Sequence, residues 1–516
     1  MKNEYALTLD FGTQSVRAMV FDDKGNSLGL SKVQYHQPYF SSKPGYAEQD
    51  PNYYLDCMYR ATNNIVKAHP ELISGIIGCT ITTFRDSAVL LDNNYKVIRP
   101  SILWLDQRQA ACPKPYPFLK KCILNLVGMS ETVKLNRART MSNWIQENEP
   151  ENWEKTAHYW ALSTFFIYKL TKKTVDTASS YTGHYPINMK KGKWDNKNSL
   201  TYDIYNIDTS LLPELVPAGS LLGTITKEAS QLSGLPEGLP LYAGGADKNC
   251  ESLGVGCIDN KIASISYGTA SSIEVINKKY IEPESFLPAY SYPAKNLYAL
   301  EVQVYRGYWM LQWFSQNFAS EEVQIAKLEQ KAVEAVLNEK IMNIPAGSEG
   351  LILQPYWGPG LKRPMAKGMI CGFSDYHTKY HVYKSIIEGI GYALREGLDS
   401  IEKRQHYKVK EIRASGGGSK SSAVCQITAD IFNKPVSRVQ TFETASLGCA
   451  IIVFVASNHF SSFEEAIKHM VHIKDTFLPN KDNTDVYEKI YKNIYLKIYP
   501  HMKKINFNIR KYSNKR

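Results

Sequence analysis

An aspartate near the midpoint of the 516-residue chain is the first candidate for chemistry. Asp247 follows a strand predicted at Leu239 to Ala243 and two glycines, and it precedes a helix predicted at Asn249 to Val255. The glycines let the backbone approach a ligand closely. An aspartate in this position either caps the following helix or stands at a strand end facing a crevice, where its carboxylate can act as a general base.

Two short loops of similar composition could hold phosphate groups. Phe11-Gly-Thr-Gln-Ser15 and Tyr267-Gly-Thr-Ala-Ser271 each lie between two predicted strands. Those strands are predicted at Tyr5 to Asp10, Val16 to Asp22, Ile262 to Ser266 and Ser272 to Ile276. Backbone N–H groups freed by glycine and the hydroxyls of Thr and Ser are donors to anions. The recurrence predicts a duplicated domain with two facing phosphate loops, the alternative being two ordinary hairpin turns.

Two further segments carry polar or glycine residues at the ends of predicted strands. Arg85 and Asp86 lie at the junction of strands predicted at Ile76 to Thr82 and Ala88 to Leu91. The glycine-rich segment 413–422 follows a short strand and precedes an amphipathic helix that starts near residue 423. Its three consecutive glycines form either a plain flexible loop or a close backbone contact to a nucleotide phosphate or sugar.

The elements that must position these residues mix strands and helices in both halves of the chain. A mainly helical stretch is predicted from about residue 119 to 170, with Trp144, Trp153 and Trp160 packing against the core. Apolar residues recur at helical spacing from Tyr380 to Ile401, which predicts one long buried helix. The pattern is typical of an α/β protein.

Composition narrows the class of protein. With 43% hydrophobic and 22% charged residues, the chain has material for two globular cores. Of the net charge of +11, six units lie in a basic segment at 501–516, expected to be solvated, and the remainder suits anionic small ligands. No basic stripe with interleaved aromatic residues indicates nucleic-acid binding.

Cysteine spacing and hydropathy exclude further classes of site. The nine cysteines show no paired spacing typical of zinc sites or a disulfide framework, so reduced thiols are expected. No long apolar run predicts a signal peptide or a membrane span, so we expect a cytoplasmic protein without membrane contact.

From Tyr5 to about His459 the chain resembles the FGGY carbohydrate kinases. The resemblance rests on several separate motifs in the family order. They are Asp10-Phe-Gly-Thr-Gln-Ser-Val-Arg17, Gly45-Tyr-Ala-Glu-Gln-Asp-Pro51, Asp247, Tyr267-Gly-Thr269, the segment 415–430 and Ala445-Ser-Leu-Gly-Cys-Ala450.

The resemblance implies roles on the nucleotide side. Asp10 would orient magnesium, through water, beside the phosphates of ATP. The residues that would bind ATP are Gly12, Thr13, Gln14, Ser15 and Arg17 at the first loop, Gly268 and Thr269 at the second, Gly307 and Gln312 beside the nucleotide, and Gly417 and Ser421 beside the adenosine.

On the substrate side, the resemblance makes Asp247 the catalytic base and places Arg85, Asp86 and Asn136 at the hydroxyls of a sugar or polyol. Glycerol kinases carry glutamate where this chain has Asp86, an aromatic residue where it has Asn136 and glutamine where it has Lys248. Lys248 pairs with Glu251 and lowers the pKa of Asp247, or faces the pocket and meets an acidic substrate, or is simply exposed.

The resemblance implies two actin-like ATPase (ribonuclease H-like) domains with a cleft between them. We expect an N-terminal domain over 1–250, a C-terminal domain over 251–480 and a basic segment over 481–516, with a homodimer as a possible assembly. The expected activity is transfer of the γ-phosphoryl group of ATP to a hydroxyl of a polyol or ketose. The alternatives are a sugar-acid kinase of the same fold, an actin-like ATPase without a sugar substrate and a silent sugar sensor.

Overall fold

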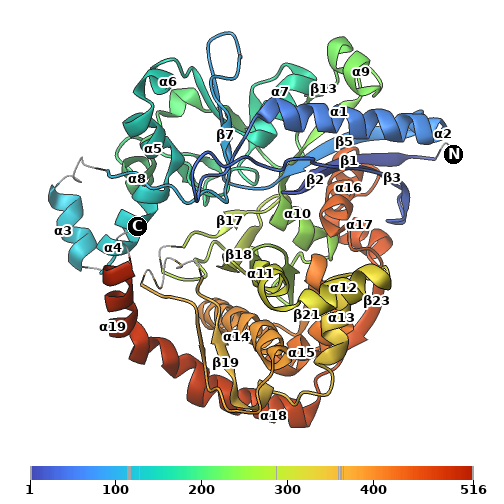
Figure 1. Ribbon diagram of the computed structural model, residues 1–516. Coiled ribbons are helices and arrows are strands. Elements are labelled where there is room, and N and C mark those ends of the chain that lie inside the picture. The colour runs from blue at the N-terminus through green and yellow to red at the C-terminus, as the bar shows by residue number, and fades with distance from the viewer. Residues whose placement is uncertain are drawn as a thin grey trace.

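Two β-sheets organise the protein, one in each half of the chain. The computed structural model describes residues 3–112, 118–126, 128–285, 287–357, 360, 363 and 365–513. In Figure 1 the N-terminal half, coloured blue to green, lies above the C-terminal half, coloured yellow to red, and α10 and α16 lie between them.

The first sheet has the strand order β13-β14-β5-β1-β2-β3. Its strands are β1 (Tyr5–Phe11), β2 (Ser15–Phe21), β3 (Ser27–Gln34), β5 (Ile76–Thr83), β13 (Leu221–Thr224) and β14 (Pro240–Ala246). Strands β1, β2 and β3 pair antiparallel, whereas β1, β5 and β14 pair parallel. Buried side chains on both faces of β1 and β2 agree with a sheet covered by helices.

The second sheet has the strand order β17-β18-β16-β15-β21-β22-β23. Its strands are β15 (Ile262–Tyr267), β16 (Ser271–Asn277), β17 (Tyr290–Ser291), β18 (Tyr298–Val304), β21 (Glu411–Ser415), β22 (Val436–Val439) and β23 (Ile473–Phe477). Strands β15, β16 and β18 pair antiparallel, and β15, β21 and β22 pair parallel. The run β3-β2-β1-β5-β14 is therefore repeated as β18-β16-β15-β21-β22, which confirms the predicted duplication.

Helices α1 (Pro51–Ala68) and α14 (Lys379–Gln405) occupy matching places in the two halves. Along the chain, α1 lies between β3 and β5, and α14 lies between β18 and β21, the equivalent strands of the repeat. The α1 helix begins at Asp50, whose carboxylate accepts the backbone N–H of Asn52, and Pro51 occupies its first turn. The α14 helix begins with a capping box and ends at His406 in a left-handed conformation. It confirms the long buried helix predicted from apolar spacing.

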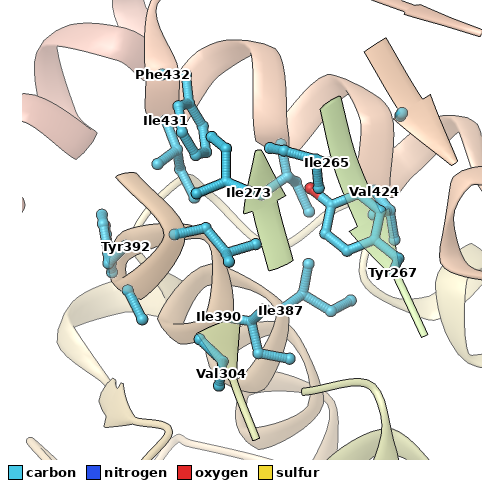
Figure 2. Packing of buried hydrophobic residues seen from close by; sticks show 14 of the residues in the cluster. Ile265, Tyr267, Ile273, Val304, Ile387, Ile390, Tyr392, Val424, Ile431 and Phe432 are labelled. Carbon is cyan, nitrogen blue, oxygen red and sulfur yellow. The ribbon is translucent and has the colours of Figure 1, made fainter. Parts of the chain in front are cut away.

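The α14 helix packs on the second sheet together with α15 (Ser422–Phe432). Figure 2 shows Ile265 and Ile273 of the sheet meeting Ile387 and Ile390 of α14 and Val424 of α15. A second core lies around the first sheet and includes α7 (Leu162–Thr171). Each sheet thus has its own buried core, as expected of two domains.

A third core lies where the two halves meet. Helix α10 (Asp247–Gly254) crosses α16 (Thr444–Ala456) almost backbone to backbone. A methyl group built at Gly254 would lie 1.8 Å from the Thr444 carbonyl oxygen, and one at Gly448 would lie 1.9 Å from that of Cys250. Both positions therefore need glycine, and their packing fixes the helix that begins at Asp247.

The remaining elements connect or cover these units. The helices are α2 (Pro70–Ile73), α3 (Phe118–Leu126), α4 (Ser130–Arg139), α5 (Met141–Asn148), α6 (Pro150–Glu154), α8 (Leu200–Tyr205), α9 (Lys227–Ser233), α11 (Trp309–Phe318), α12 (Ser320–Leu328), α13 (Val333–Lys340) and α17 (Phe463–Met470). The strands are β4 (Glu48–Gln49), β6 (Ala88–Leu91), β7 (Ser101–Ile102), β8 (His158–Ala161), β9 (Val175–Thr177), β10 (Ile187–Asn188), β11 (Lys193–Trp194), β12 (Glu214–Val216), β19 (Ile352–Gln354) and β20 (Met369–Cys371).

The stretch predicted to be mainly helical contains helices α3 to α7 and the short strand β8, and residue 127 lies outside the described residues. Trp160 is buried within β8, because that strand pairs with β6 inside the domain. Trp144 and Trp153 are partly buried against the neighbouring cluster. The predicted packing of the three tryptophans is confirmed.

The C-terminal segment differs from a free tail. Helix α18 (Lys481–Ile490), a π-helical turn at Tyr491–Tyr495 and helix α19 (Leu496–Ser513) follow one another. Tyr487, Tyr491 and Tyr495 are buried in the core of the second domain. Most side chains of the basic segment 501–513 are exposed, as expected, but its backbone is helical, and residues 514–516 lie outside the described residues.

Candidate active site

Asp247 is the first residue of α10 and directly follows β14, so it stands at the carboxyl end of a parallel strand. Its side chain is 27% exposed, and its Oδ1 lies 3.8 Å from Arg85 Nε. Burial raises the pKa of Asp247, and the charges of Lys248 and Arg85 oppose that rise. The carboxylate is both accessible and more basic than an ordinary aspartate.

Lys248 does not point away into solvent. Its Nζ donates to Glu251 Oε2 at 2.9 Å and to Ser266 Oγ at 2.6 Å, which links α10 to the end of β15. Burial would lower the pKa of Lys248, but the charges of Glu251 and Asp247 outweigh it and raise the pKa. The predicted pairing with Glu251 is confirmed.

Arg85 bridges the two halves of the protein. Its two terminal nitrogens donate to both carboxylate oxygens of Glu301 at 2.6 and 2.7 Å, a bidentate pair between the segment after β5 and strand β18. Glu301 is only 3% exposed and lies opposite Glu274 on β16. Burial and Glu301 raise the pKa of Glu274 to about 8. Sequence reasoning missed Glu301, because its partner lies 216 residues away.

Asp86 and Asn136 meet through a residue that sequence reasoning also missed. His184 Nδ1 lies 2.6 Å from Asp86 Oδ2, and His184 Nε2 lies 3.0 Å from Asn136 Oδ1. Burial alone would raise the pKa of Asp86, but the charge and hydrogen bonds of His184 hold it below its usual value. A histidine in a connecting loop carries no sequence signal for this role.

The first phosphate loop connects β1 to β2 and begins after the buried Asp10. Arg17 lies opposite Asp10 on β2 and donates to its Oδ2 at 3.2 Å, while Arg17 Nε lies 3.0 Å from Glu443 Oε2. Burial raises the pKa of Asp10 to about 6, with Arg17 opposing and the charges of Glu443, Asp247 and Glu251 adding to the rise. The carboxylate of Asp247 therefore contributes to the raised pKa of Asp10.

The turn itself is held by short-range bonds. The Gly12 N–H donates to the Ser15 carbonyl at 3.0 Å, and the Gln14 carbonyl accepts from the Tyr35 N–H at 3.0 Å. Trp104 Nε1 lies 3.4 Å from Thr13 Oγ1. Gly12 and Thr13 are partly exposed and Gln14 is exposed, whereas Ser15 is buried in β2. Three of the four predicted loop residues are therefore accessible to a ligand.

The second phosphate loop connects β15 to β16 and has Gly268 and Thr269 partly exposed. Their carbonyl groups accept the N–H groups of Tyr308 and Trp309 at 3.1 and 3.3 Å, which ties the loop to the start of α11. A methyl group at Gly307 would lie 2.1 Å from Ser271 Oγ. Gly307 thus packs directly against Ser271, where the loop joins β16.

Gln312 is exposed on α11, and Gly417 and Ser421 lie in the glycine-rich turn between β21 and α15. A methyl group at Gly416 would lie 2.8 Å from the Tyr267 carbonyl oxygen, and one at Gly418 would lie 2.2 Å from the Tyr308 ring. Among the described residues, a methyl group at Gly417 would have only the Tyr267 carbonyl oxygen within 4 Å, at 3.9 Å. The turn therefore packs on the second loop and leaves Gly417 open.

The hydroxyl of Ser421 accepts hydrogen bonds from two neighbouring residues. It accepts the Val424 N–H as the N-cap of α15, and its Oγ also accepts from Asn338 Nδ2 at 2.9 Å. Asn338 is a further residue at this turn that sequence reasoning missed.

The residues that the structure describes form no metal site made entirely of protein ligands. Within the described ranges, no group of three or more His, Cys, Asp or Glu side chains could hold a metal ion. Magnesium commonly keeps several waters and takes one or two carboxylates plus substrate phosphates. The buried carboxylate of Asp10 beside the first loop fits that coordination.

In the same described part of the chain, no helix is long and apolar enough to cross a membrane.

Comparison with known proteins agrees with this geometry. The family models for the N-terminal and C-terminal domains of the FGGY family of carbohydrate kinases match residues 5–254 and 263–457. The chain is 26% identical to a xylulose kinase of Lactococcus lactis over 517 residues, which cover 99% of each chain.

Solved structures share the fold. A gluconate kinase from Lactobacillus acidophilus has a TM-score of 0.80 at 22% identity, and a ligand-bound xylulose kinase from the same organism has a TM-score of 0.79 at 21% identity. Both alignments cover 97% of this chain and 98% of the other. The two domains have the actin-like ATPase fold, and the chain belongs to the FGGY family of carbohydrate kinases, phosphotransferases with an alcohol group as acceptor.

Proposed function

We propose that this protein uses ATP to phosphorylate a hydroxyl group of a neutral polyol or ketose, with Asp247 as the general base. The observation that carries the proposal is the position of Asp247. It combines an accessible carboxylate, a raised pKa and proximity to Arg85, at the point where the two halves meet. A raised pKa makes a carboxylate a better proton acceptor near neutral pH.

The reaction can be written with the residues of this chain. The substrate hydroxyl gives its proton to Asp247, its oxygen bonds to the γ-phosphorus of ATP, and the bond from that phosphorus to the β-phosphate oxygen breaks to release ADP with the electron pair. Arg85, Asp86, Asn136 and His184 would hold the other hydroxyl groups. Positioning and charge neutralisation supply most of the acceleration in such transfers.

Nucleotide binding would involve both phosphate loops and the glycine-rich turn. Gly12, Thr13, Gln14 and Arg17 would contact phosphates from the first domain, and Gly268 and Thr269 from the second. Gly417, Ser421 and Gln312 would lie toward the adenosine. Magnesium, when bound, would neutralise phosphate charge, and Asp10 would hold its hydration shell.

The charge balance around the substrate residues favours a neutral substrate. The guanidinium of Arg85 is neutralised by Glu301, and the ammonium of Lys248 is neutralised by Glu251. A substrate carboxylate that displaced Glu301 from Arg85 would break a buried ion pair, at a cost of about 3 to 5 kcal/mol by analogy with other buried pairs. A sugar-acid kinase is the alternative.

The first test replaces the base. Asp247→Asn keeps the shape of the side chain but cannot accept a proton, so turnover should fall by about 10² to 10⁴ while sugar binding changes little. Asp259→Asn is a matched control, because Asp259 lies on the surface and pairs with Lys261. Near-normal turnover in Asp247→Asn would contradict the role of general base.

The second test identifies the substrate class. Polyols, ketoses and sugar acids are compared by ADP release with the wild-type enzyme. Turnover with a neutral compound and none with acids is expected. ATP hydrolysis that no sugar changes would favour an actin-like ATPase, and sugar binding without turnover would favour a sensor.

A further inference from the structure

The ammonium group of Lys248 is fixed by two oxygen atoms from different elements. Glu251 lies one turn along α10, and Ser266 is near the end of β15, immediately before the second phosphate loop. Ser266 Oγ also donates to Glu251 Oε2 at 2.8 Å, so the three side chains form a closed set of hydrogen bonds. Such a set holds a flexible lysine side chain in one place.

The ammonium group borders the second phosphate loop. A methyl group built at Gly268 would lie 3.3 Å from Lys248 Nζ. An ammonium has three N–H donors, and in the described part of the chain only Glu251 and Ser266 accept from Nζ. The side chain is 17% exposed and its Nζ lies beside the partly exposed Gly268, which places the third donor next to a ligand bound at the loop.

The duplicated fold allows this position to be compared with its equivalent in the other half. Asp10-Phe-Gly-Thr13 and Ser266-Tyr-Gly-Thr269 occupy the same place at the end of the first strand of each repeat. The first loop has a carboxylate there, suited to a hydrated metal ion. The second loop has a hydroxyl that binds an ammonium, which suits a phosphate oxygen.

We propose that Lys248 is a catalytic residue that binds the transferred phosphoryl group, and that Glu251 and Ser266 are the positioning residues that hold its ammonium beside Gly268. This inference rests on the proposed kinase function. During transfer, the third N–H of Lys248 donates to a non-bridging oxygen of the phosphoryl group. Lys248 keeps all its protons, because Asp247 accepts the proton of the substrate hydroxyl.

Lys248→Met removes the charge and keeps most of the side-chain volume. Lys434→Met is a matched control, because Lys434 has a similar side-chain exposure of 18% and also pairs with a buried carboxylate, Glu402, at 3.3 Å. Since Lys248→Met leaves Glu251 without its cation, the double variant Lys248→Met, Glu251→Gln tests the same loss without a buried unpaired charge.

Turnover of Lys248→Met and of the double variant should fall by about 10² to 10³, the scale for losing one donor to transition-state charge. The sugar KM and the Kd for ADP should stay within about threefold, as expected when an interaction belongs to the transition state. Lys434→Met should change none of these values. Turnover within about threefold of wild type in the double variant would overturn the proposal, as would an equal loss of affinity for ADP.

A binding measurement separates this inference from the proposed function. Magnesium, ADP and aluminium fluoride together mimic the transferring phosphoryl group without any sugar turnover. Lys248→Met and the double variant should weaken binding of this mimic by at least about tenfold relative to ADP alone, because only the mimic reaches the lysine. Equal binding of the mimic by wild type and both variants would overturn the role of Lys248, even if no sugar proves to be a substrate. Failure of every sugar in the panel would overturn only the proposed function.

Discussion

The two phosphate loops share one strand–turn–strand unit, but their surroundings differ in charge. The first loop follows the buried Asp10, which the charges of Glu443, Asp247 and Glu251 make harder to ionise. The second loop follows Ser266 and borders the ammonium of Lys248. The same backbone turn is therefore preceded by a carboxylate in one half, and by a hydroxyl that binds an ammonium in the other.

The difference indicates how one fold can serve two needs in phosphoryl transfer. A hydrated magnesium ion needs a carboxylate, whereas the phosphoryl oxygens need donors. The residues that we propose for the sugar also come from both halves, since Arg85 belongs to the first domain and its partner Glu301 to the second. Each half therefore depends on the other to complete its site.

The largest expected effect is a difference in turnover between variants at the two equivalent positions, Asp10 and Ser266. Asp10→Asn should lower turnover by about 10² to 10³, because an amide is a poor substitute for a carboxylate beside magnesium. Ser266→Ala should cost less than about tenfold, because Glu251 still holds Lys248. Turnover measured against magnesium concentration tests the comparison. Equal losses in the two variants would show that the loops do not divide the work in this way.

The raised pKa of Asp10 predicts a pH-dependent change in the stability of the fold. The pKa of Asp10 is about 6 in the folded protein and 3.8 in a model peptide, so the folded state binds more protons between these values. Ionising Asp10 therefore destabilises the fold as pH rises from about 4 to 6, and the full cost remains above pH 6. Asp10→Asn should raise the free energy of unfolding by up to about 3 kcal/mol above pH 6 and by little near pH 4.

Denaturant unfolding at a series of pH values checks this prediction. Asp22→Asn is a suitable control, because Asp22 lies in the exposed turn after β2. A gain in Asp10→Asn that is the same at pH 4 and pH 7 would contradict a penalty from the ionised carboxylate.

Breaking the ion pair between the halves should have an intermediate effect. Glu301→Gln removes the charge that holds the guanidinium of Arg85, and a lost charged hydrogen bond typically costs about 1.5 to 3 kcal/mol. The sugar KM should therefore rise by about 10- to 100-fold, with the Kd for ADP almost unchanged. Steady-state kinetics and ADP titration measure the two values. A change in ADP affinity as large as the change in KM would show that Glu301 acts on the whole fold.

Much of the fold could be predicted from the sequence. The paired strands around both loops, the strand before Asp247 and the long helix α14 all have clear local patterns of apolar and turn residues, and the structure confirms them. The recurrence of aromatic-Gly-Thr also predicted the duplication, because each copy sits at the same turn of a repeated sheet.

Long-range pairing could not be predicted in the same way. Glu301 reaches Arg85 only after two domains have folded and met, and His184 joins Asp86 to Asn136 from a loop without a motif. The tyrosines at 487, 491 and 495 are a different case, because they recur at helical spacing in the sequence but their charged neighbours masked the buried face that they form. Local patterns therefore predicted the positions of the loops but not the partners of their side chains.

The smallest expected effect tests the two loops at their glycines. A methyl group at Gly12 would lie 3.5 Å from the Ser15 carbonyl oxygen, an ordinary contact, whereas one at Gly268 would lie 3.2 Å from the Ala270 carbonyl oxygen and 3.3 Å from Lys248 Nζ. Gly268→Ala should therefore lower the free energy of unfolding by about 1 kcal/mol, the low end for overpacking, and Gly12→Ala by less than about 0.5 kcal/mol. Denaturant unfolding without nucleotide measures both. In a Lys248→Met, Glu251→Gln background the loss from Gly268→Ala should be smaller than in the wild type, since the thioether chain end can move away more easily than an ammonium held by Glu251 and Ser266. An equal loss in both backgrounds would mean that the backbone of the loop, rather than the fixed lysine, limits the space at Gly268.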